Sequence, residues 1–152
     1  PAAPTTTSFQ SGGYDMPNDT APKIGALSFL VIDDEPFVQK LAVRILGIMG
    51  ATDIETASNG VEALANIDNA ATQPDVLLVD LNMPDMGGAE LLRHLADRNY
   101  SGAIVIVSSA DEEILLVAEG RAKYRQMNVL GHITKPITQE TLTEVLGNRT
   151  GL

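Results

Sequence analysis

Residues 29–37 have the sequence FLVIDDEPF. A short apolar run ends at once in three acidic residues, Asp33, Asp34 and Glu35, and these are followed by Pro36. Like charges repel one another, and moving carboxylates out of water costs free energy. If the apolar run is a buried strand, something near its end must offset the cost of these acids.

Similar apolar runs recur along the chain. They are too short for helices, and three of them, ALSFLVID, PDVLLVD and AIVIVSS, are rich enough in apolar residues to be buried strands. Strands are predicted at residues 26–33, 52–57 (the weakest), 74–80, 103–109 and 129–134.

Amphipathic stretches lie between the apolar runs. Phe37, Leu41 and Ile45 follow the spacing of one helical face, and Pro36 suits a first helical turn. We predict N-caps at Asn59 and Thr138. Helices are predicted at residues 35–50, ending at Gly50, 59–68, 87–98, 111–127, with an interruption at Gly120, and 138–147.

The order of these elements defines the fold class. Five strands that alternate with five helices predict an α/β protein with a parallel sheet covered on both faces. In such sheets the functional crevice lies outside the carboxyl ends of the strands. The residues that follow each strand are therefore the candidates for function.

Length and charge limit the possible functions. The chain has 152 residues, which suit one domain, and a net charge of −10, which disfavours binding to nucleic acid or to an anionic membrane surface. It has no cysteine, so disulfides and thiolate metal sites are excluded. We see no signal peptide and no run of about 20 apolar residues, and we expect a cytoplasmic protein.

The first 23 residues differ from the rest. Pro, Ala, Thr, Ser and Gly make up 15 of them, and no apolar periodicity is present. This composition predicts a flexible tail or linker at 1–23, followed by one folded domain at 24–152.

Polar residues stand at the predicted strand ends. Asp33 and Asp34 end the first strand, Asp80 ends the third, Ser108 ends the fourth, and Lys135 follows the fifth. In a parallel sheet these groups converge on one edge. Mg²⁺ prefers oxygen ligands and keeps several waters, so three carboxylates could hold it and leave room for a phosphoryl group that Lys135 balances.

Each of these residues also has a purely structural explanation. Asp33 and Asp34 could cap the helix that Pro36 opens, and Asp80 could begin a turn in DLNMPDMGG. Ser108 could be a core hydroxyl and Lys135 a solvated lysine. The conjunction of all of them at the functional edge favours metal-assisted phosphoryl transfer.

The two histidines offer no metal-ligand spacing. His132 is expected on a strand, where an edge-strand histidine is its simplest interpretation, and His94 is expected on a helix surface. The chain has no phosphate-binding loop of the form G-x-x-x-x-G-K-[ST], no G-x-G-x-x-G after the first strand and no G-x-S-x-G.

The segments VIDDEP, VDLNMPDMGG, VSSA and ITKPI resemble the receiver domain of two-component response regulators over residues 26–147. The resemblance implies a doubly wound, flavodoxin-like fold with the strand order 2-1-3-4-5. The sequence around SSADEEILLVAEG also resembles that of receivers fused to cyclic-di-GMP phosphodiesterase (EAL) domains, although no EAL domain is present here.

The resemblance assigns a role to each strand-end residue. It makes Asp80 the phosphoryl acceptor and Ser108 the switch hydroxyl, and it pairs Lys135 with the phosphate. It implies that Mg²⁺ is bound by Asp80, by Asp34 directly, by Asp33 through water and by the backbone carbonyl of Asn82. Pro136 matches a proline whose preceding peptide is often cis.

His132 falls at the rotating switch position, which is more often Tyr or Phe in the family. The implied partners are a sensor histidine kinase or phosphotransfer protein, and an output domain or downstream protein. The latter would bind the face formed by the fourth helix, fifth strand and fifth helix, and a homodimer could use that face as well.

Two other classes of function stay open at this stage. An unphosphorylated, receiver-like binding module is the main alternative, although such modules usually lack an acid or the lysine. A Mg²⁺-dependent phosphohydrolase is the other, but the short loops leave little room for a general acid and a substrate pocket. The resemblance itself implies no enzyme beyond self-catalysed phosphoryl acceptance and slow autodephosphorylation.

Overall fold

The structure, a computed structural model, describes residues 23–109 and 111–149. Its centre is a five-stranded sheet in the order β2-β1-β3-β4-β5, and every neighbouring pair is parallel. The strands are β1 (Ser28–Ile32), β2 (Asp53–Ala57), β3 (Val76–Asp80), β4 (Ala103–Ser108) and β5 (Asn128–Thr134). The predicted fold class and strand order are confirmed, and a single 3-10 turn at Ile24–Ala26 precedes β1.

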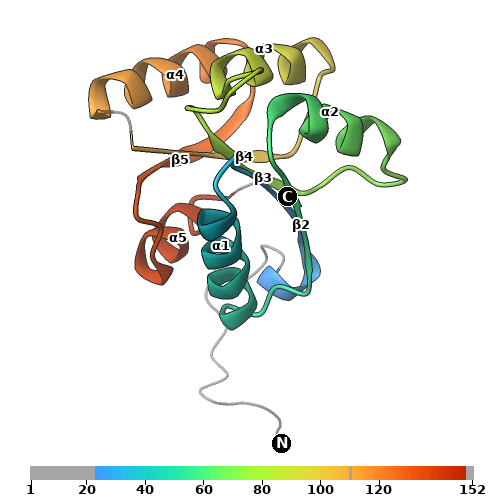
Figure 1. The fold of residues 1–152 in the computed structure, drawn as a ribbon, viewed down its shortest axis with the longest axis vertical. Helices are drawn as coiled ribbons and strands as arrows, with labels where there is room; N and C mark the ends of the chain where they lie inside the picture. Colours follow the sequence, from blue (N-terminus) through green and yellow to red (C-terminus); the bar gives the residue numbers. More distant parts are fainter. Residues whose placement is uncertain (1–22, 110, 150–152) are drawn as a thin grey trace, which may run out of the picture.

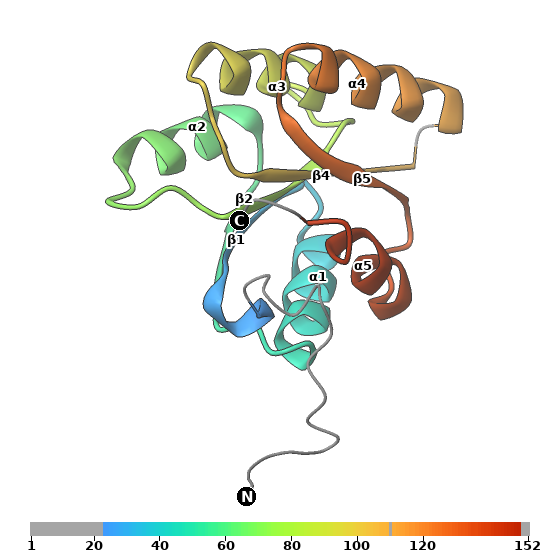
Figure 2. The ribbon, with the colours of Figure 1, turned by 180° about the vertical axis from the view of Figure 1, so that it is seen from behind.

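Helices cover both faces of this sheet. Figures 1 and 2 show α1 and α5 on one face, and α2, α3 and α4 on the other. The helices are α1 (Pro36–Ile48), α2 (Gly60–Asn69), α3 (Gly88–Asp97), α4 (Glu112–Tyr124) and α5 (Gln139–Leu146). The predicted tail at 1–23 lies outside the described residues except for Lys23.

The central strands supply both hydrophobic cores. In β1, Phe29 and Val31 face the core under α1 and α5, whereas Leu30 and Ile32 face the core under α2, α3 and α4. Side chains alternate along a strand, so a strand buried on both faces needs a continuous apolar run. By contrast β2, an edge strand, is mostly exposed, which explains why its sequence signal was weak.

The helix ends follow the predicted signals. Pro36 is the first residue of α1, and Gly50, just beyond its end, has a φ of 109° that favours glycine. The side chain of Asn59 accepts a hydrogen bond from the backbone of Glu62, and Thr138 forms a capping box. These short-range contacts fix where each helix begins or ends.

The predicted interruption at Gly120 is wrong. Helix α4 is continuous through Gly120, and a Cβ at that position would meet no atom within 4 Å. A glycine costs a helix about 1 kcal/mol relative to alanine, but it keeps its backbone hydrogen bonds and does not break the helix. The helix ends before 127 because Gln126 adopts a left-handed conformation with a φ of 67°.

Candidate functional site

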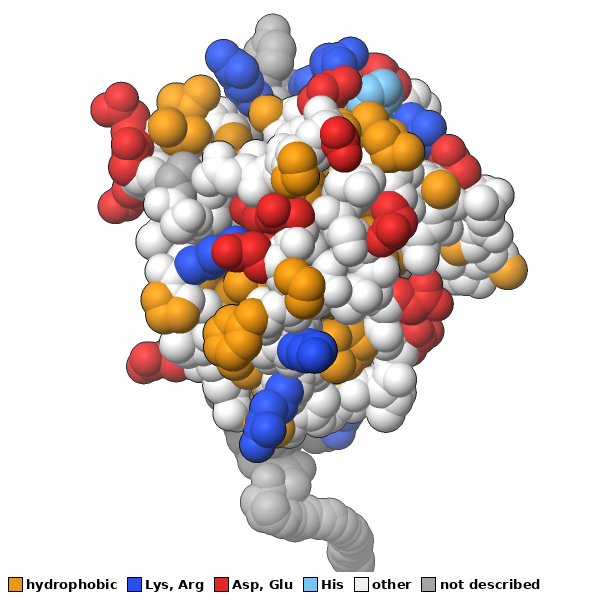
Figure 3. All heavy atoms as spheres, in the orientation of Figure 1, with side chains coloured by type: hydrophobic (Ala, Val, Ile, Leu, Met, Phe, Trp, Pro, Cys, Tyr) orange, Lys and Arg blue, Asp and Glu red, His pale blue; other side chains and the backbone are white. Residues whose placement is uncertain are grey.

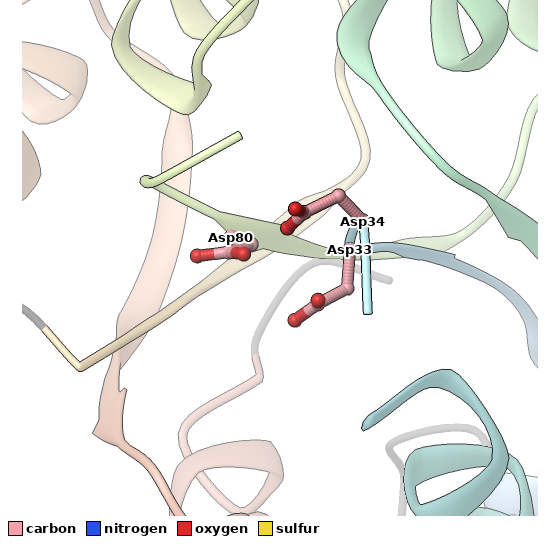
Figure 4. A group of neighbouring side chains, drawn as sticks. All are labelled: Asp33, Asp34 and Asp80. Atoms are coloured by element: carbon pink, nitrogen blue, oxygen red, sulfur yellow. The ribbon is translucent and has the colours of Figure 1, made fainter. Parts of the chain in front are cut away.

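Three carboxylates meet at the carboxyl edge of the sheet. Strands β1 and β3 are neighbours, so Asp33 and Asp34 after β1 lie beside Asp80 at the end of β3. One oxygen from each lies within 4.8 Å of the other two. Figure 4 shows the side chains of Asp33 and Asp34 extending toward the side on which Asp80 lies. The predicted convergence of these acids is therefore present.

Lys135 supplies the positive charge of this cluster. Its Nζ lies 3.0 Å from Asp33 Oδ2, 3.2 Å from Glu35 Oε1 and 3.4 Å from Asp80 Oδ2. Burial by itself lowers the pKa of Lys135, but its hydrogen bonds to Asp33 and Glu35 and the charge of Asp80 raise that pKa overall. The side chain of Lys135 therefore stays protonated. The Lys135–Pro136 peptide bond is cis, as the resemblance implied.

Asp80 is only 2% exposed, and its pKa is raised to about 6. Burial is the main cause, and the negative charge of Asp33 adds to it. The backbone N–H of Asn82, which donates to Asp80 Oδ1 at 3.0 Å, and the charge of Lys135 only partly offset these effects. Asp80 is thus a carboxylate whose negative charge would be stabilised by a further cation.

Asp33 and Asp34 lie in different surroundings. Asp33 is buried, and its side chain accepts a hydrogen bond from the backbone N–H of Glu35 in addition to the contact with Lys135. Asp34 is half-buried and has no hydrogen bond or ion pair within the described part of the chain. Neither acid caps α1, whose N-cap is Glu35, so that structural explanation is wrong.

Asn82 joins two of the predicted site residues. Its backbone N–H holds Asp80, while its side-chain Nδ2 donates to Ser108 Oγ at 2.8 Å. Ser108 is fully buried at the end of β4, next to β3. The hydroxyl therefore lies in the same hydrogen-bonded group as the acid, as its strand-end position predicted.

The histidines lie apart from the acidic cluster. On the edge strand β5, His132 Nδ1 is 3.5 Å from Glu119 Oε2 of α4, and the His132 side chain is 24% exposed. On α3, the half-buried His94 has its Nε2 3.7 Å from Glu90 Oε2. Both positions agree with the simple structural interpretations, and the switch role of His132 stays a prediction.

Sequence reasoning left three residues without a role. Glu35 is a third carboxylate on Lys135, and Glu119 pairs with His132. Gln39 donates from Nε2 to the carbonyl of Asp33 at 2.6 Å and to that of Ala57 at 3.3 Å, which fastens the acidic loop to the end of β2. Only Glu35 carried a signal, because it extends the acidic run that opens the site.

The cluster fits a hard divalent cation. Its donor atoms are carboxylate oxygens, which Mg²⁺ prefers, and two of the three acids are buried. A divalent ion among them would offset the repulsion that raises the pKa of Asp80.

The described residues contain no helix that is long and apolar enough to cross a membrane.

The sequence model of the response regulator receiver domain matches residues 29–147, and the chain belongs to this family. It is therefore a receiver domain of the two-component type, and such domains are generally non-catalytic signalling modules that bind kinases and phosphotransfer proteins.

Two relatives from Pseudomonas aeruginosa illustrate the range of the family. The positive alginate biosynthesis regulatory protein is 30% identical over 79% of this chain and 46% of its own length. The cyclic di-GMP phosphodiesterase RocR is 29% identical over 79% of this chain and 30% of its own length. The chain thus spans less than half of either relative. A phosphodiesterase of the kind that the sequence suggested is among its relatives.

Solved receiver structures share the fold. A response regulator from Colwellia psychrerythraea is 29% identical, with a TM-score of 0.67 over 82% of this chain and all of its own. A response regulator receiver domain protein from Clostridium thermocellum is 25% identical, with a TM-score of 0.69 over 80% of this chain and 92% of its own.

Proposed function

We propose that this domain accepts a phosphoryl group on Asp80 in a phosphorelay and uses it to switch an output surface. The observation that carries the proposal is the environment of Asp80. This buried carboxylate has a raised pKa and lies beside two acids and a lysine at the carboxyl edge of the sheet. Such an arrangement is suited to binding a cation and to attacking a phosphorus atom.

The transfer step needs little chemistry from the protein. An Asp80 oxygen forms a bond to the phosphorus of a phosphohistidine, while the bond between phosphorus and the histidine nitrogen breaks and its electron pair stays on that nitrogen. Asn82 orients the acid through Oδ1, and Lys135 lies near Oδ2, where its charge would stabilise the phosphoryl oxygens. The product is an aspartyl phosphate, which water hydrolyses slowly.

We assign the Mg²⁺ ligands as Asp34 directly, Asp33 through water, Asp80, and the backbone carbonyl of Asn82. The partners of the two neighbouring acids support this division. Asp33 already binds Lys135, whereas Asp34 has no partner within the described residues. When bound, Mg²⁺ would supply further charge stabilisation to the transferring phosphoryl group.

We propose that Ser108 and His132 transmit the change. The phosphoryl oxygens would accept a hydrogen bond from the Ser108 hydroxyl, whose oxygen now accepts a hydrogen bond from Asn82 Nδ2 at 2.8 Å. Moving Ser108 inward would vacate space for His132, and it would thereby shift a two-state equilibrium at the face formed by α4, β5 and α5. The proposed partners are a sensor histidine kinase or a phosphotransfer protein, an output domain or downstream protein, and a second copy of this chain. We propose that the protein acts in the cytoplasm.

Intact mass after incubation with Mg²⁺ and acetyl phosphate tests the proposal. We expect the wild type to gain one phosphoryl group and Asp80→Asn to gain none. Asp85→Asn is a matched control, because it makes the same chemical change at an exposed position in the following loop. A gain in Asp80→Asn would overturn the acceptor assignment.

No gain in the wild type, together with no binding of beryllofluoride, would favour the unphosphorylated binding module instead. Sustained turnover of a small phosphate ester would favour a phosphohydrolase.

A further inference from the structure

A groove of about 470 Å³ lies between α3 and α4, on the side of α4 away from the proposed output face. Its floor is apolar and includes the nearly buried Leu92 and Met127. Ile114 and Val117 of α4 line its wall, and they are 53% and 50% exposed. Half-exposed large apolar side chains above an apolar floor are typical of a surface that another protein covers.

The charge of this groove is opposite to that of the whole chain. The net charge of the chain is −10, yet three arginines line the groove together with one acid. Five of the ten Lys and Arg residues of the chain lie in or just after these two helices, at positions 93, 98, 121, 123 and 125. Figure 3 shows basic side chains along the top of the molecule, over α3 and α4, with acidic side chains between them.

The arginines differ in how far they are neutralised. Arg93 lies 3.6 Å from Glu90, and Arg125 lies 2.9 Å from Asp97. Arg121 is exposed and makes no ion pair with the residues that the structure describes. The groove therefore keeps a positive charge that an incoming carboxylate could neutralise.

We propose that the α3–α4 groove is a docking site for a short amphipathic helix of a partner protein, with acidic residues beside its apolar stripe. From Ile114 to Arg125 the groove follows α4 for about 16 Å, the length of about three helical turns. Apolar residues of the partner would contact Val117 and Leu92, and its carboxylates would pair with Arg121 and its neighbours.

A polyanion is a poorer occupant of the same groove. Nucleic acids and anionic membranes carry dense negative charge, which a chain of net charge −10 repels over a distance. A single acidic helix reaches the local arginines, and its apolar side covers the floor. The proposal concerns a different surface from the α4–β5–α5 face and does not depend on phosphorylation of Asp80.

Selection from a random dodecapeptide phage library on the full chain tests this inference. Peptides enriched on the wild type are compared with those enriched on Arg121→Glu and Val117→Asp. The matched controls are Arg44→Glu and Val61→Asp, which make the same changes at exposed positions on α1 and α2. Circular dichroism verifies that each variant is folded.

We expect enriched peptides that combine Leu or Phe at helical spacing with Asp or Glu. Their affinity, measured by fluorescence anisotropy of a synthetic consensus peptide, should fall about tenfold or more in both groove variants and stay unchanged in both controls. High salt should also weaken it. Enrichment of basic peptides, or equal selection on wild type and groove variants, would overturn the proposal.

Discussion

The pKa of an aspartate beside a basic residue shifts in opposite directions at two places in this molecule. On the surface, Arg98 Nε lies 2.9 Å from Asp68 Oδ1, and the hydrogen bond from Arg98 holds the pKa of Asp68 below its usual value. At the sheet edge, Lys135 Nζ lies 3.4 Å from Asp80 Oδ2, yet the pKa of Asp80 is raised to about 6.

Solvent explains the difference. The side chains of Arg98 and Asp68 are 36% and 49% exposed, so water solvates both charges and the pair adds little. Asp80 and Lys135 are 2% and 14% exposed, and Asp33 adds a second buried negative charge. The single charge of Lys135 cannot neutralise two buried carboxylates, so the cluster has too little positive charge to balance its acids. That shortage makes the edge of the sheet suitable for a cation and a phosphoryl group.

The first prediction concerns a substitution that removes Lys135, the only cation of the buried cluster among the described residues. Lys135→Met leaves Asp33 and Asp80 buried without a positive partner, and we expect the free energy of unfolding to fall by about 3 kcal/mol. Urea denaturation at neutral pH measures this change. Lys40→Met, at an exposed position on α1, is the control and should have little effect. Equal effects of the two substitutions would remove the distinction between buried and exposed charge.

The second prediction removes one of the buried negative charges. With divalent ions chelated, Asp80→Asn should raise the free energy of unfolding at pH 7 by roughly 3 kcal/mol, because the neutral amide avoids the cost that raises the pKa of Asp80 from 3.8 to about 6.

The gain from Asp80→Asn should depend on pH. Above pH 6 the folded protein bears the full cost of the charged Asp80. As the pH falls from 6 toward 3.8, the folded state takes up a proton before the unfolded state does, so the wild type regains this stability. The difference between the two proteins should therefore shrink over that range in denaturation experiments. A constant difference would contradict the raised pKa.

The third prediction supplies the missing positive charge. Mg²⁺ should raise the melting temperature of the wild type, and a tenfold excess over the dissociation constant corresponds to about 1.4 kcal/mol. Asp34→Asn should weaken this response because Asp34 is the proposed direct ligand. Asp85→Asn again serves as the control. An equal response in all three proteins would place the ion elsewhere.

The fourth prediction concerns the surface pair and has the smallest expected effect. Arg98→Gln removes the partner of Asp68, but water can solvate the carboxylate in its place. The melting temperature should change less than in Asp80→Asn, and phosphorylation by acetyl phosphate should be unchanged. A loss of stability as large as that of Lys135→Met would show that exposure does not separate the two clusters.

Local patterns predicted most of the fold and the membership of the acidic cluster. Continuous apolar runs identified β1, β3 and β4, and strand alternation with helices placed Asp33, Asp34 and Asp80 at one edge of the sheet. The prediction failed at Gly120, because a helical glycine lowers propensity without removing a backbone hydrogen bond. It also missed Gln39, whose contacts depend on a loop geometry that no local pattern encodes.

The sequence by itself determined which residues reach the edge of the sheet, because strand periodicity and parallel connection are local and topological properties. Only the tertiary structure decided that Lys135 is shared among Asp33, Glu35 and Asp80, and that Asn82 holds Ser108. It also decided that α3 and α4 enclose an apolar groove with arginines along it. These features depend on distances and burial between segments far apart in the chain, and packing alone sets those quantities.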